Sequence, residues 1–294
     1  ANEAPVMAAD TAVNVVENTT AVGVYAATDV DGDTLTYSLG GADAALFSIN
    51  SATGAVSFTA APDFETPLDA NADGVYEITV TATDNGTGNL SDSQNVSITV
   101  TDANDAPIAD DETGLVTPED TVLNIDVLTG DTDADGDALS VTGINGTAIT
   151  VGGTVAVTNG SVTLLANGTL NFTPATNYNG PVSFTYTLSD GSLTDTGNVA
   201  INVTGANDAP IADDETGLVT PEETVLNIDV LTGDTDADAD PLSVTEINST
   251  AITVGGTVAV TNGSVTLLAN GTLEFTPATN YNGPVNSTYP VSDG

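Results

Sequence analysis

Residues 154–172 read TVAVTNGSVTLLANGTLNF, and two Asn-Gly pairs, at Asn159-Gly160 and Asn167-Gly168, divide this stretch into short segments. Within each segment apolar and polar side chains alternate, which is the period of a half-buried β-strand. Asn-Gly favours a type I′ turn, because both central residues of that turn need a positive φ. The stretch therefore predicts two successive β-hairpins.

The stretch belongs to a repeated unit. Residues 108–191 recur at 211–294 with an offset of 103, and 74 of these 84 aligned positions are identical. Residues 1–104 have diverged from both copies but keep two short motifs in the same order. Asn-Glu-Ala-Pro or Asn-Asp-Ala-Pro opens each unit, at residues 2–5, 104–107 and 207–210, and an Asp-x-Asp-x-Asp motif follows each opening. We expect three domains, at 1–104, 105–207 and 208–294, with very short linkers.

Each domain is predicted to contain about seven strands. In the first domain the alternating segments are residues 13–16, 22–26, 35–39, 55–58, 76–83 and 95–100. No helical period of useful length occurs, so the expected fold class is all-β, a tandem, elongated array of antiparallel Greek-key, Ig-like β-sandwiches. The third domain stops before the counterpart of the strand at residues 197–203, so we expect it to lack its last strand. Truncation and exchange of a strand with another subunit both remain open.

The composition excludes several functions. The chain contains no Lys, Arg, His or Cys, and its 42 acidic residues give a formal net charge of −42. Nucleic acid is excluded as a partner because phosphate binding needs basic side chains. Disulfides, thiolate metal sites, a His base, a Cys or Lys nucleophile and an Arg clamp are also excluded. Glycoside hydrolysis by a pair of carboxylates remains formally possible, but the chain lacks Trp to stack on sugar rings and is predicted not to be an enzyme. No apolar stretch is long enough to span a membrane.

The acidic residues are clustered and have no basic partner. Two carboxylates about 4 Å apart repel each other by roughly 4 kcal/mol at an effective dielectric constant near 20. Clustered acids must therefore stay hydrated, hold protons or bind cations. Ca²⁺ takes six to eight oxygen ligands from carboxylates, amide carbonyls and water, and alternating Asp residues in a loop provide them. Ca²⁺ is the predicted cofactor.

The first domain resembles a bacterial cadherin-like domain. The resemblance rests on Val16-Glu17-Asn18, Ala27-Thr28-Asp29-Val30-Asp31, Asp63-Phe64-Glu65, Ala82-Thr83-Asp84 and Val100 to Pro107. The second and third domains resemble the VCBS-type repeats of large bacterial surface adhesins, through Thr117-Pro118-Glu119-Asp120, residues 131–137, Tyr178-Asn179-Gly180 and residues 186–191. In cadherins, calcium lies at the junction between successive domains. The resemblance therefore implies three groups of ligands.

The ligands that the resemblance implies for the first junction are Glu17, Asp63, Glu65, Asp102, Asn104, Asp105, Asp133, Asp135 and Asp190. Those for the second junction are Glu119, Asn207, Asp208, Asp236, Asp238 and Asp293. Asn2, Asp29, Asp31 and Asp84 would form a half-site at the start of the first domain. The Asp-Phe-Glu motif has no clear counterpart in the later domains, which leaves the number of ions at the second junction open.

Two loops allow other interpretations. Residues 131–136 fit the first six positions of an EF-hand loop, but position twelve is Thr142 rather than Glu. Residues 69–74 have the same pattern and are either an additional calcium loop or an acidic hairpin. A single Asp-Gly pair is more simply interpreted as a solvated turn. That interpretation does not explain why Asp-x-Asp recurs at the same place in all three units, or why basic residues are absent.

The implied function is that of a calcium-rigidified extender in a secreted bacterial surface adhesin or extracellular filament, located at the cell surface. The alternative is a calcium-dependent binding module for polysaccharide or for homophilic cell adhesion. The expected partners are neighbouring repeats of the array, other copies of the chain joined by strand exchange, or a surface polysaccharide.

Overall fold

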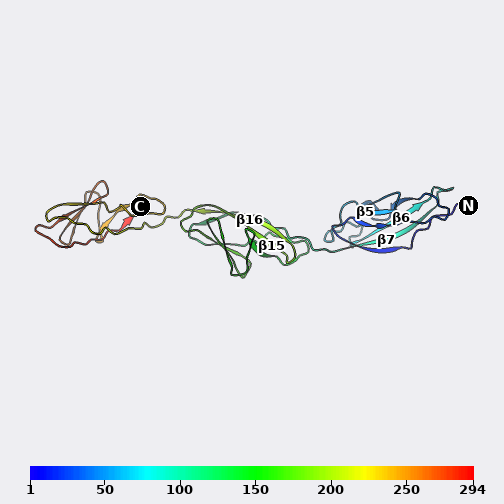
Figure 1. The fold of residues 1–294 in the computed structure, drawn as a ribbon, viewed down its shortest axis with the longest axis horizontal. Coiled ribbons are helices and arrows are strands. Elements are labelled where there is room, and N and C mark those ends of the chain that lie inside the picture. Colours follow the sequence, from blue (N-terminus) through cyan, green and yellow to red (C-terminus); the bar gives the residue numbers. More distant parts are fainter. The chain divides into compact units, whose positions relative to one another are not determined.

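The computed structural model describes residues 1–294, which form β-strands and one 3-10 turn, η1 (Ala44–Leu46) (Figure 1). The chain divides into two compact units. The first unit consists of residues 1–109, 130–140 and 187–196, and the second consists of residues 110–129, 141–186 and 197–294. Each acidic cluster discussed below lies within one unit.

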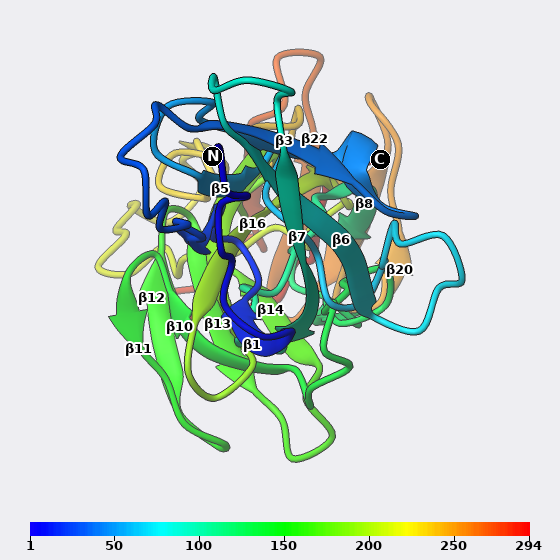
Figure 2. The same ribbon diagram turned by 90° about the vertical axis from the view of Figure 1, so that its right-hand side faces the viewer.

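The first sandwich has two sheets. One sheet has the order β1-β7-β6-β3 and the other β2-β5-β4. Figure 2 shows β3, β6 and β7 next to one another. The strands are β1 (Thr11–Val16), β2 (Ala21–Val24), β3 (Thr36–Gly40), β4 (Phe47–Ile49), β5 (Ala55–Phe58), β6 (Val75–Thr83) and β7 (Ser91–Thr101). The sequence pattern missed β4, whose three residues are too few to show a period.

The predicted antiparallel pairing holds in the first sandwich except at one strand pair. β1 pairs with β7 in parallel, with Thr11 opposite Val96 and Val16 opposite Thr101. Strands that follow one another in a sandwich reverse direction, so the first and seventh strands run the same way and must be parallel when they are neighbours. β7 ends at Thr101, directly before the first linker.

The core of the first sandwich is built around three aromatic rings. Tyr76 is 2% exposed, and its ring contacts Phe58 and Phe47 edge-on at centroid distances of 5.2 and 6.0 Å. Alternate residues of β6 and β7 bury their side chains beside these rings. Burial of this face fixes the register of β6 against β7.

The second sandwich has a five-stranded sheet, β11-β10-β15-β16-β8, and a four-stranded sheet, β12-β13-β14-β9. β8 and β16 again pair in parallel, as the first and last strands of the domain. The strands are β8 (Glu112–Pro118), β9 (Leu123–Ile125), β10 (Ser140–Ile144), β11 (Thr147–Ala148), β12 (Thr154–Val157), β13 (Gly160–Leu164), β14 (Leu170–Pro174), β15 (Gly180–Ser189) and β16 (Thr194–Thr204).

The two predicted hairpins form, but neither has the expected type I′ turn. Val157 pairs with Gly160, so the first turn lies at Thr158-Asn159, one residue earlier than predicted, and only Asn159 has a positive φ, of 60°. At the second turn, Gly168 has a φ of 88° and Leu165 accepts its amide, which makes a three-residue loop. Gly160 is the first residue of β13, and the position requires glycine because a Cβ there would lie 2.5 Å from both Phe172 Cε2 and Thr173 O.

This packing predicts the effect of a single methyl group. Gly160→Ala is expected to destabilise the second sandwich by about 1–3 kcal/mol, the usual effect of overpacking a closed site. Gly40→Ala in β3 is the control, since the nearest atoms to its Cβ are 4.0 Å away. Urea denaturation of both variants measures the difference. Equal stability of the two variants would show that Phe172 can move aside.

The third sandwich keeps the β12–β14 region and differs elsewhere. Its strands form sheets β17-β23-β22-β21, β18-β24 and β19-β20. They are β17 (Leu226–Ile228), β18 (Ser243–Val244), β19 (Glu246–Ile247), β20 (Thr250–Ala251), β21 (Thr257–Val260), β22 (Gly263–Leu267), β23 (Leu273–Pro277) and β24 (Val291–Ser292). Residues 215–221 and 283–290, the counterparts of β8 and most of β15, are not strands. No strand in this sandwich takes the position of β16.

Candidate metal centres

A group of acidic side chains gathers at the start of the first sandwich. Oxygens of Asp29, Asp31 and Asp33 lie within 4.8 Å of one another. The Asp31 and Asp33 amides donate to Asp29 Oδ1, at 2.9 and 3.1 Å, while Asp29 Oδ2 is buried and accepts no hydrogen bond. Burial raises the pKa of Asp33, and the negative charges of Asp29 and Asp84 raise it further. This loop holds its carboxylates together without a counter-charge.

Two further contacts connect this loop to the opening residues of the domain. Asn2 Nδ2 donates to Asp84 Oδ2 at 2.9 Å, and the Glu3 amide donates to Asp31 Oδ2 at 2.7 Å. Asp84 is itself buried at the end of β6, where its other oxygen accepts the Gly86 and Leu90 amides. Hydrogen bonds to residues 2 and 3 therefore bring together all four residues implied for the half-site, which are Asn2, Asp29, Asp31 and Asp84.

The same pair of contacts recurs at the first linker. Asn104 Nδ2 donates to Asp190 Oδ2 at 2.8 Å, and the Asp105 amide donates to Asp135 Oδ2 at 2.8 Å. Asp133 occupies the place of Asp29, with one oxygen accepting the Asp137 amide and Oδ2 buried without a hydrogen bond. The diverged first domain and the second domain thus build this end of the sandwich in one way.

The end of the first sandwich contributes acids to the same linker. Glu17 is 1% exposed and accepts the Ala103 amide at 2.7 Å and the Phe64 amide at 2.8 Å. Oxygens of Glu17, Glu65 and Asp105 lie within 4.8 Å of one another, and so do those of Glu65, Asp102 and Asp135. Glu65 belongs to both groups. The linker therefore carries two adjoining sets of carboxylates.

Glu65 is the residue whose surroundings most clearly favour a bound cation. Its Oε2 is buried and accepts no hydrogen bond. Burial raises the pKa of Glu65, and the charges of Glu17 and Asp135 raise it further. The pKa of Asp102 is raised by burial and then by its contact with Asp135. Burying an unpaired carboxylate is costly, so a cation at this position would relieve both the desolvation and the repulsion.

The second linker repeats the arrangement within the second unit. Asn207 Nδ2 donates to Asp293 Oδ2 at 2.6 Å, the Asp208 amide donates to Asp238 Oδ2 at 2.7 Å, and Glu119 accepts the Ala206 amide at 2.6 Å. Asp208 Oδ2 and Asp236 Oδ2 are buried without hydrogen bonds. Burial raises the pKa of Asp208, with Asp120 the strongest of the neighbouring charges.

The donor sets fit Ca²⁺. They consist of carboxylates with neutral Asn side chains beside them, and each linker has two acids with a buried oxygen that accepts no hydrogen bond, Glu65 and Asp133 at the first and Asp208 and Asp236 at the second. Ca²⁺ prefers oxygen ligands of this kind in flexible geometry, whereas Zn²⁺ and copper favour nitrogen or sulfur ligands that the chain lacks.

One residue implied for the first junction lies outside the two carboxylate groups, although it is hydrogen-bonded with Glu65, and several residues close to the acids were missed. Asp63 is not in either carboxylate group, and its Oδ1 accepts the Thr66 amide at 2.9 Å. The hydrogen bonds with Thr66 hold the pKa of Asp63 below its ordinary value. The missed residues are Asp33 and Asp240, the third acids of their motifs, and Asn18 and Asp120, which follow the buried glutamates.

The rival loops have simpler explanations. Residues 69–74 form an acidic turn that is closed by its own backbone, because Asp69 accepts the Asp73 and Gly74 amides and Asp73 Oδ1 accepts the Val75 amide. The EF-hand interpretation of residues 131–136 requires flanking helices, and the structure has strands and loops there.

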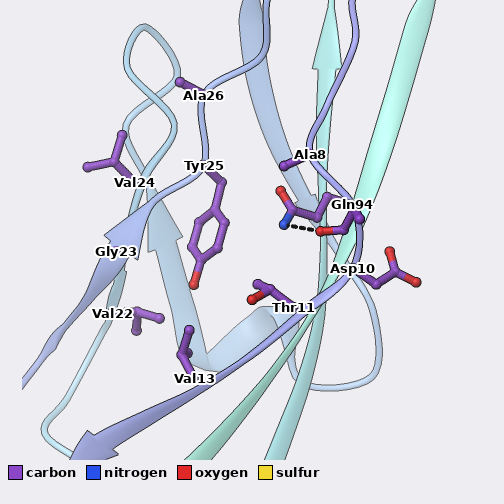
Figure 3. Close-up of a pocket in the computed structure, with 11 residues that line it drawn as sticks. Ala8, Asp10, Thr11, Val13, Val22, Gly23, Val24, Tyr25, Ala26 and Gln94 are labelled. Carbon is purple, nitrogen blue, oxygen red and sulfur yellow. Dashed lines mark hydrogen bonds between the residues drawn. The ribbon is translucent and has the colours of Figure 1, made fainter.

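The first sandwich also has a surface pocket of about 410 Å³ between residues 8–13, β2 and Gln94 (Figure 3). Figure 3 shows Gln94 turned towards the chain rather than into the pocket, and its Nε2 donates to Ala9 O at 2.7 Å. Most of the remaining lining is small and apolar, apart from the Tyr25 ring. The pocket contains no set of convergent polar groups that would bind a small molecule.

None of the helical structure present has the length and hydrophobicity needed to cross a bilayer.

Comparison with known proteins agrees with this architecture. The chain is 38% identical over 121 residues to human "Protocadherin Fat 1" and 40% identical over 96 residues to mouse "Cadherin-17". These matches cover 40% and 32% of this chain but only 2% and 11% of the relatives, so the chain spans a small part of their length. The fold matches the EC22-24 crystal structure of mouse cadherin-23 with a TM-score of 0.53 and 19% identity, over 96% of this chain and 91% of that one.

Family matches divide the chain at the positions of the repeats. Residues 11–101 match the cadherin domain family, and residues 104–202 and 207–294 each match the bacterial Ig domain family. Cadherin-like domains are adhesion and structural modules rather than enzymes, in agreement with the prediction for this chain. With matches over more than half of its length, the chain belongs to the bacterial Ig domain family and carries a cadherin domain at its amino-terminal end.

Proposed function

We propose that this chain is a calcium-stiffened structural segment of a secreted bacterial surface protein. The observation that carries the proposal is the repeated construction of the linkers. Asn104 and Asn207 each donate to an Asp of the following domain, and in both linkers the next residue's amide donates to another Asp. Buried carboxylate oxygens without hydrogen bonds lie beside these contacts in each case.

Calcium would supply positive charge that carboxylates from successive domains can share. The residues that would hold it at the first linker are Glu17, Glu65, Asp102, Asp105, Asp133, Asp135 and Asp190, with Asn104 beside them. Those at the second are Glu119, Asp208, Asp236, Asp238 and Asp293, with Asn207 beside them. Without the cation these acids repel one another and the linker is free to bend. With the cation bound, each linker bends less.

The proposal places the chain outside the cell, where the calcium concentration suits sites of this type. Extracellular calcium modules have dissociation constants of about 10⁻⁴–10⁻³ M. Sites of this strength fill only where calcium is millimolar, a condition met outside cells. The two nearly identical repeats suit an extender, which needs length more than distinct binding faces. Sugar recognition has less support, since the chain has no Trp and only 4% aromatic residues.

Small-angle X-ray scattering during a calcium titration tests the proposal. The maximum dimension is expected to rise, and the signature of flexibility to fall, between about 0.1 and 10 mM calcium. The same titration with NaCl at matched ionic strength is the control for simple charge screening. Scattering that changes equally in both titrations would contradict the proposal. Calcium-dependent retention on a glycan array would instead favour the binding-module alternative.

A further inference from the structure

One glycine of the first sandwich lies against the ends of two side chains in the acidic group at the start of that sandwich. Gly86 belongs to the loop of residues 84–90 between β6 and β7 and is half-buried. A Cβ at this position would lie 2.1 Å from Asn2 Oδ1 and 2.3 Å from Asp33 Oδ2. Real Cβ atoms do not approach other atoms so closely. The backbone of Gly86 therefore contacts these oxygens only because it carries no side chain.

The backbone conformation does not explain why position 86 is a glycine. Gly88, in the same loop, has a φ of 106°, which favours glycine. Gly86 does not have a positive φ, so alanine can adopt the same backbone conformation. What requires glycine at position 86 is the space that the side chains of Asn2 and Asp33 occupy.

Hydrogen bonds fix this loop beside the acids. Asn85 Oδ1 accepts the Thr34 amide at 2.9 Å, which attaches the loop to the residue after the acidic motif. The amides of Gly86 and Leu90 donate to Asp84 Oδ1, at 3.1 and 3.0 Å, which attaches it to the end of β6. The backbone of Gly86 is thus held in one place against the acidic group.

We propose that Gly86 is a positioning residue for calcium, an inference that rests on the proposed function. Oxygens of Asp29, Asp31 and Asp33 lie within 4.8 Å of one another, and Asp29 Oδ2 is buried and accepts no hydrogen bond. The Gly86 backbone holds the oxygens of Asn2 and Asp33 beside this carboxylate. A side chain at position 86 would push those oxygens out of the group.

The surroundings of Gly86 differ from those of the crowded Gly160. The atoms that a Cβ at Gly86 would meet are the ends of side chains, whereas Gly160 also lies against the backbone oxygen of Thr173. Ends of side chains can rotate away, so Gly86→Ala should keep the fold and displace the two oxygens. Residues that orient metal ligands typically change metal affinity by about 10–100-fold when they are replaced. Gly86→Ala should therefore weaken calcium binding and lower the metal-free stability less than Gly160→Ala does.

The first linker has no loop that covers its acids in this way. The loop after Asp190 is shorter, because Asp190 Oδ1 already accepts the Leu193 amide. A Cβ on Gly191 in that loop would have no atom within 4 Å. A change at Gly86 should consequently act on the acidic group at the start of the first sandwich and leave the first linker unaffected.

Hydrogen exchange of the whole chain during a calcium titration tests this role. The calcium concentration that gives half of the final protection is determined separately for residues 84–90 and for residues 102–106. Both segments of the unmodified chain should gain protection. In Gly86→Ala the concentration for residues 84–90 should rise at least about ten-fold. The concentration for residues 102–106 should keep its value.

Two further variants and a stability measurement serve as controls. Gly40→Ala adds the same methyl group where the nearest atoms are 4.0 Å away, so it should change neither concentration. In a chain that already carries Asn2→Ala and Asp33→Ala, Gly86→Ala should have little further effect, because the oxygens that it displaces are gone. Urea denaturation in metal-stripped buffer compares the stability of Gly86→Ala with that of Gly160→Ala.

The outcomes distinguish this inference from the proposed function. If no segment of the unmodified chain gained protection from calcium, the proposed function and this inference would both be wrong. Normal protection with an unchanged concentration in Gly86→Ala would overturn this inference alone. So would an equal rise at residues 84–90 and 102–106, or a loss of metal-free stability as large as that of Gly160→Ala, because Gly86 would then act on the fold and not on the metal ligands.

Discussion

In saturating calcium the first sandwich is expected to unfold roughly 10–20 °C higher than in metal-free buffer. One site filled to 100 times its dissociation constant contributes about 2.7 kcal/mol, and 1 kcal/mol shifts the unfolding midpoint of a domain this size by about 4–8 °C. The effect is large because Glu65 Oε2 and Asp133 Oδ2 are buried and accept no hydrogen bond, so a bound cation relieves the cost of burying their charges. Differential scanning calorimetry with and without calcium measures it, and equal midpoints would contradict calcium binding.

A charge-removing variant separates a metal site from general sensitivity to ions. Glu65→Gln should raise the unfolding midpoint in metal-free buffer, because it removes a buried negative charge that faces Glu17 and Asp135. The same variant should lose much of the gain from calcium. Glu77→Gln is the matched control, since it changes the net charge equally from an exposed position on β6 and outside every carboxylate group. A calcium response that both variants lose equally would point to screening alone.

The sequence predicted the fold wherever a strand was long enough to show its period. β6 and β7 alternate over nine and eleven residues, and their positions were found to within a few residues. β4 was missed because three residues carry no pattern. The parallel pairing of β1 with β7 could not be seen in local sequence, because it depends on how many times the chain reverses between the two strands.

The candidate sites were predictable to a similar extent and for a similar reason. Repetition placed Asn104 and Asn207 in equivalent positions, and the structure gives both the same contact. The burial of Glu17 and the closeness of Glu65 to Asp135 depend on tertiary packing, so only family resemblance suggested them. The turn at Asn159-Gly160 shows the opposite case. There the Asn-Gly pair was a strong local signal for the turn. The structure nevertheless has Gly160 in a strand, paired with Val157 and packed against Phe172, so the turn lies one residue earlier.

Stability should depend on pH with opposite signs in the presence and absence of calcium. The pKa values of Asp33, Glu65, Asp102 and Asp208 are raised above their ordinary values of 3.8 for Asp and 4.5 for Glu. Between the ordinary and the raised pKa, the folded chain binds more protons than the unfolded chain. Stability must then fall as pH rises through that window. Metal-free protein is therefore expected to become more stable as the pH is lowered from 7 towards about 4.5.

Below that range the sign reverses. The pKa values of Asp10, Asp63, Asp111 and Asp190 are lowered, chiefly by hydrogen bonds from neighbouring residues such as Asn95 and Thr66. Their stabilising effect is present above pH 3.8 and is lost as they take up protons below it. Metal-free protein should therefore show a stability maximum near pH 4–5. A metal-free protein whose stability passed through no maximum in this range would contradict these pKa shifts.

With calcium bound, lowering the pH from 7 to about 4.5 should decrease stability, because protons compete with the cation for the same carboxylates. Urea denaturation at fixed ionic strength, in metal-stripped buffer and in 10 mM calcium, gives the two slopes. Glu65→Gln should flatten both slopes, since the residue takes part in both equilibria. Slopes of the same sign in the two buffers would mean that the carboxylates of the linkers do not bind the metal, because one set of groups cannot favour protonation and metal binding at the same pH.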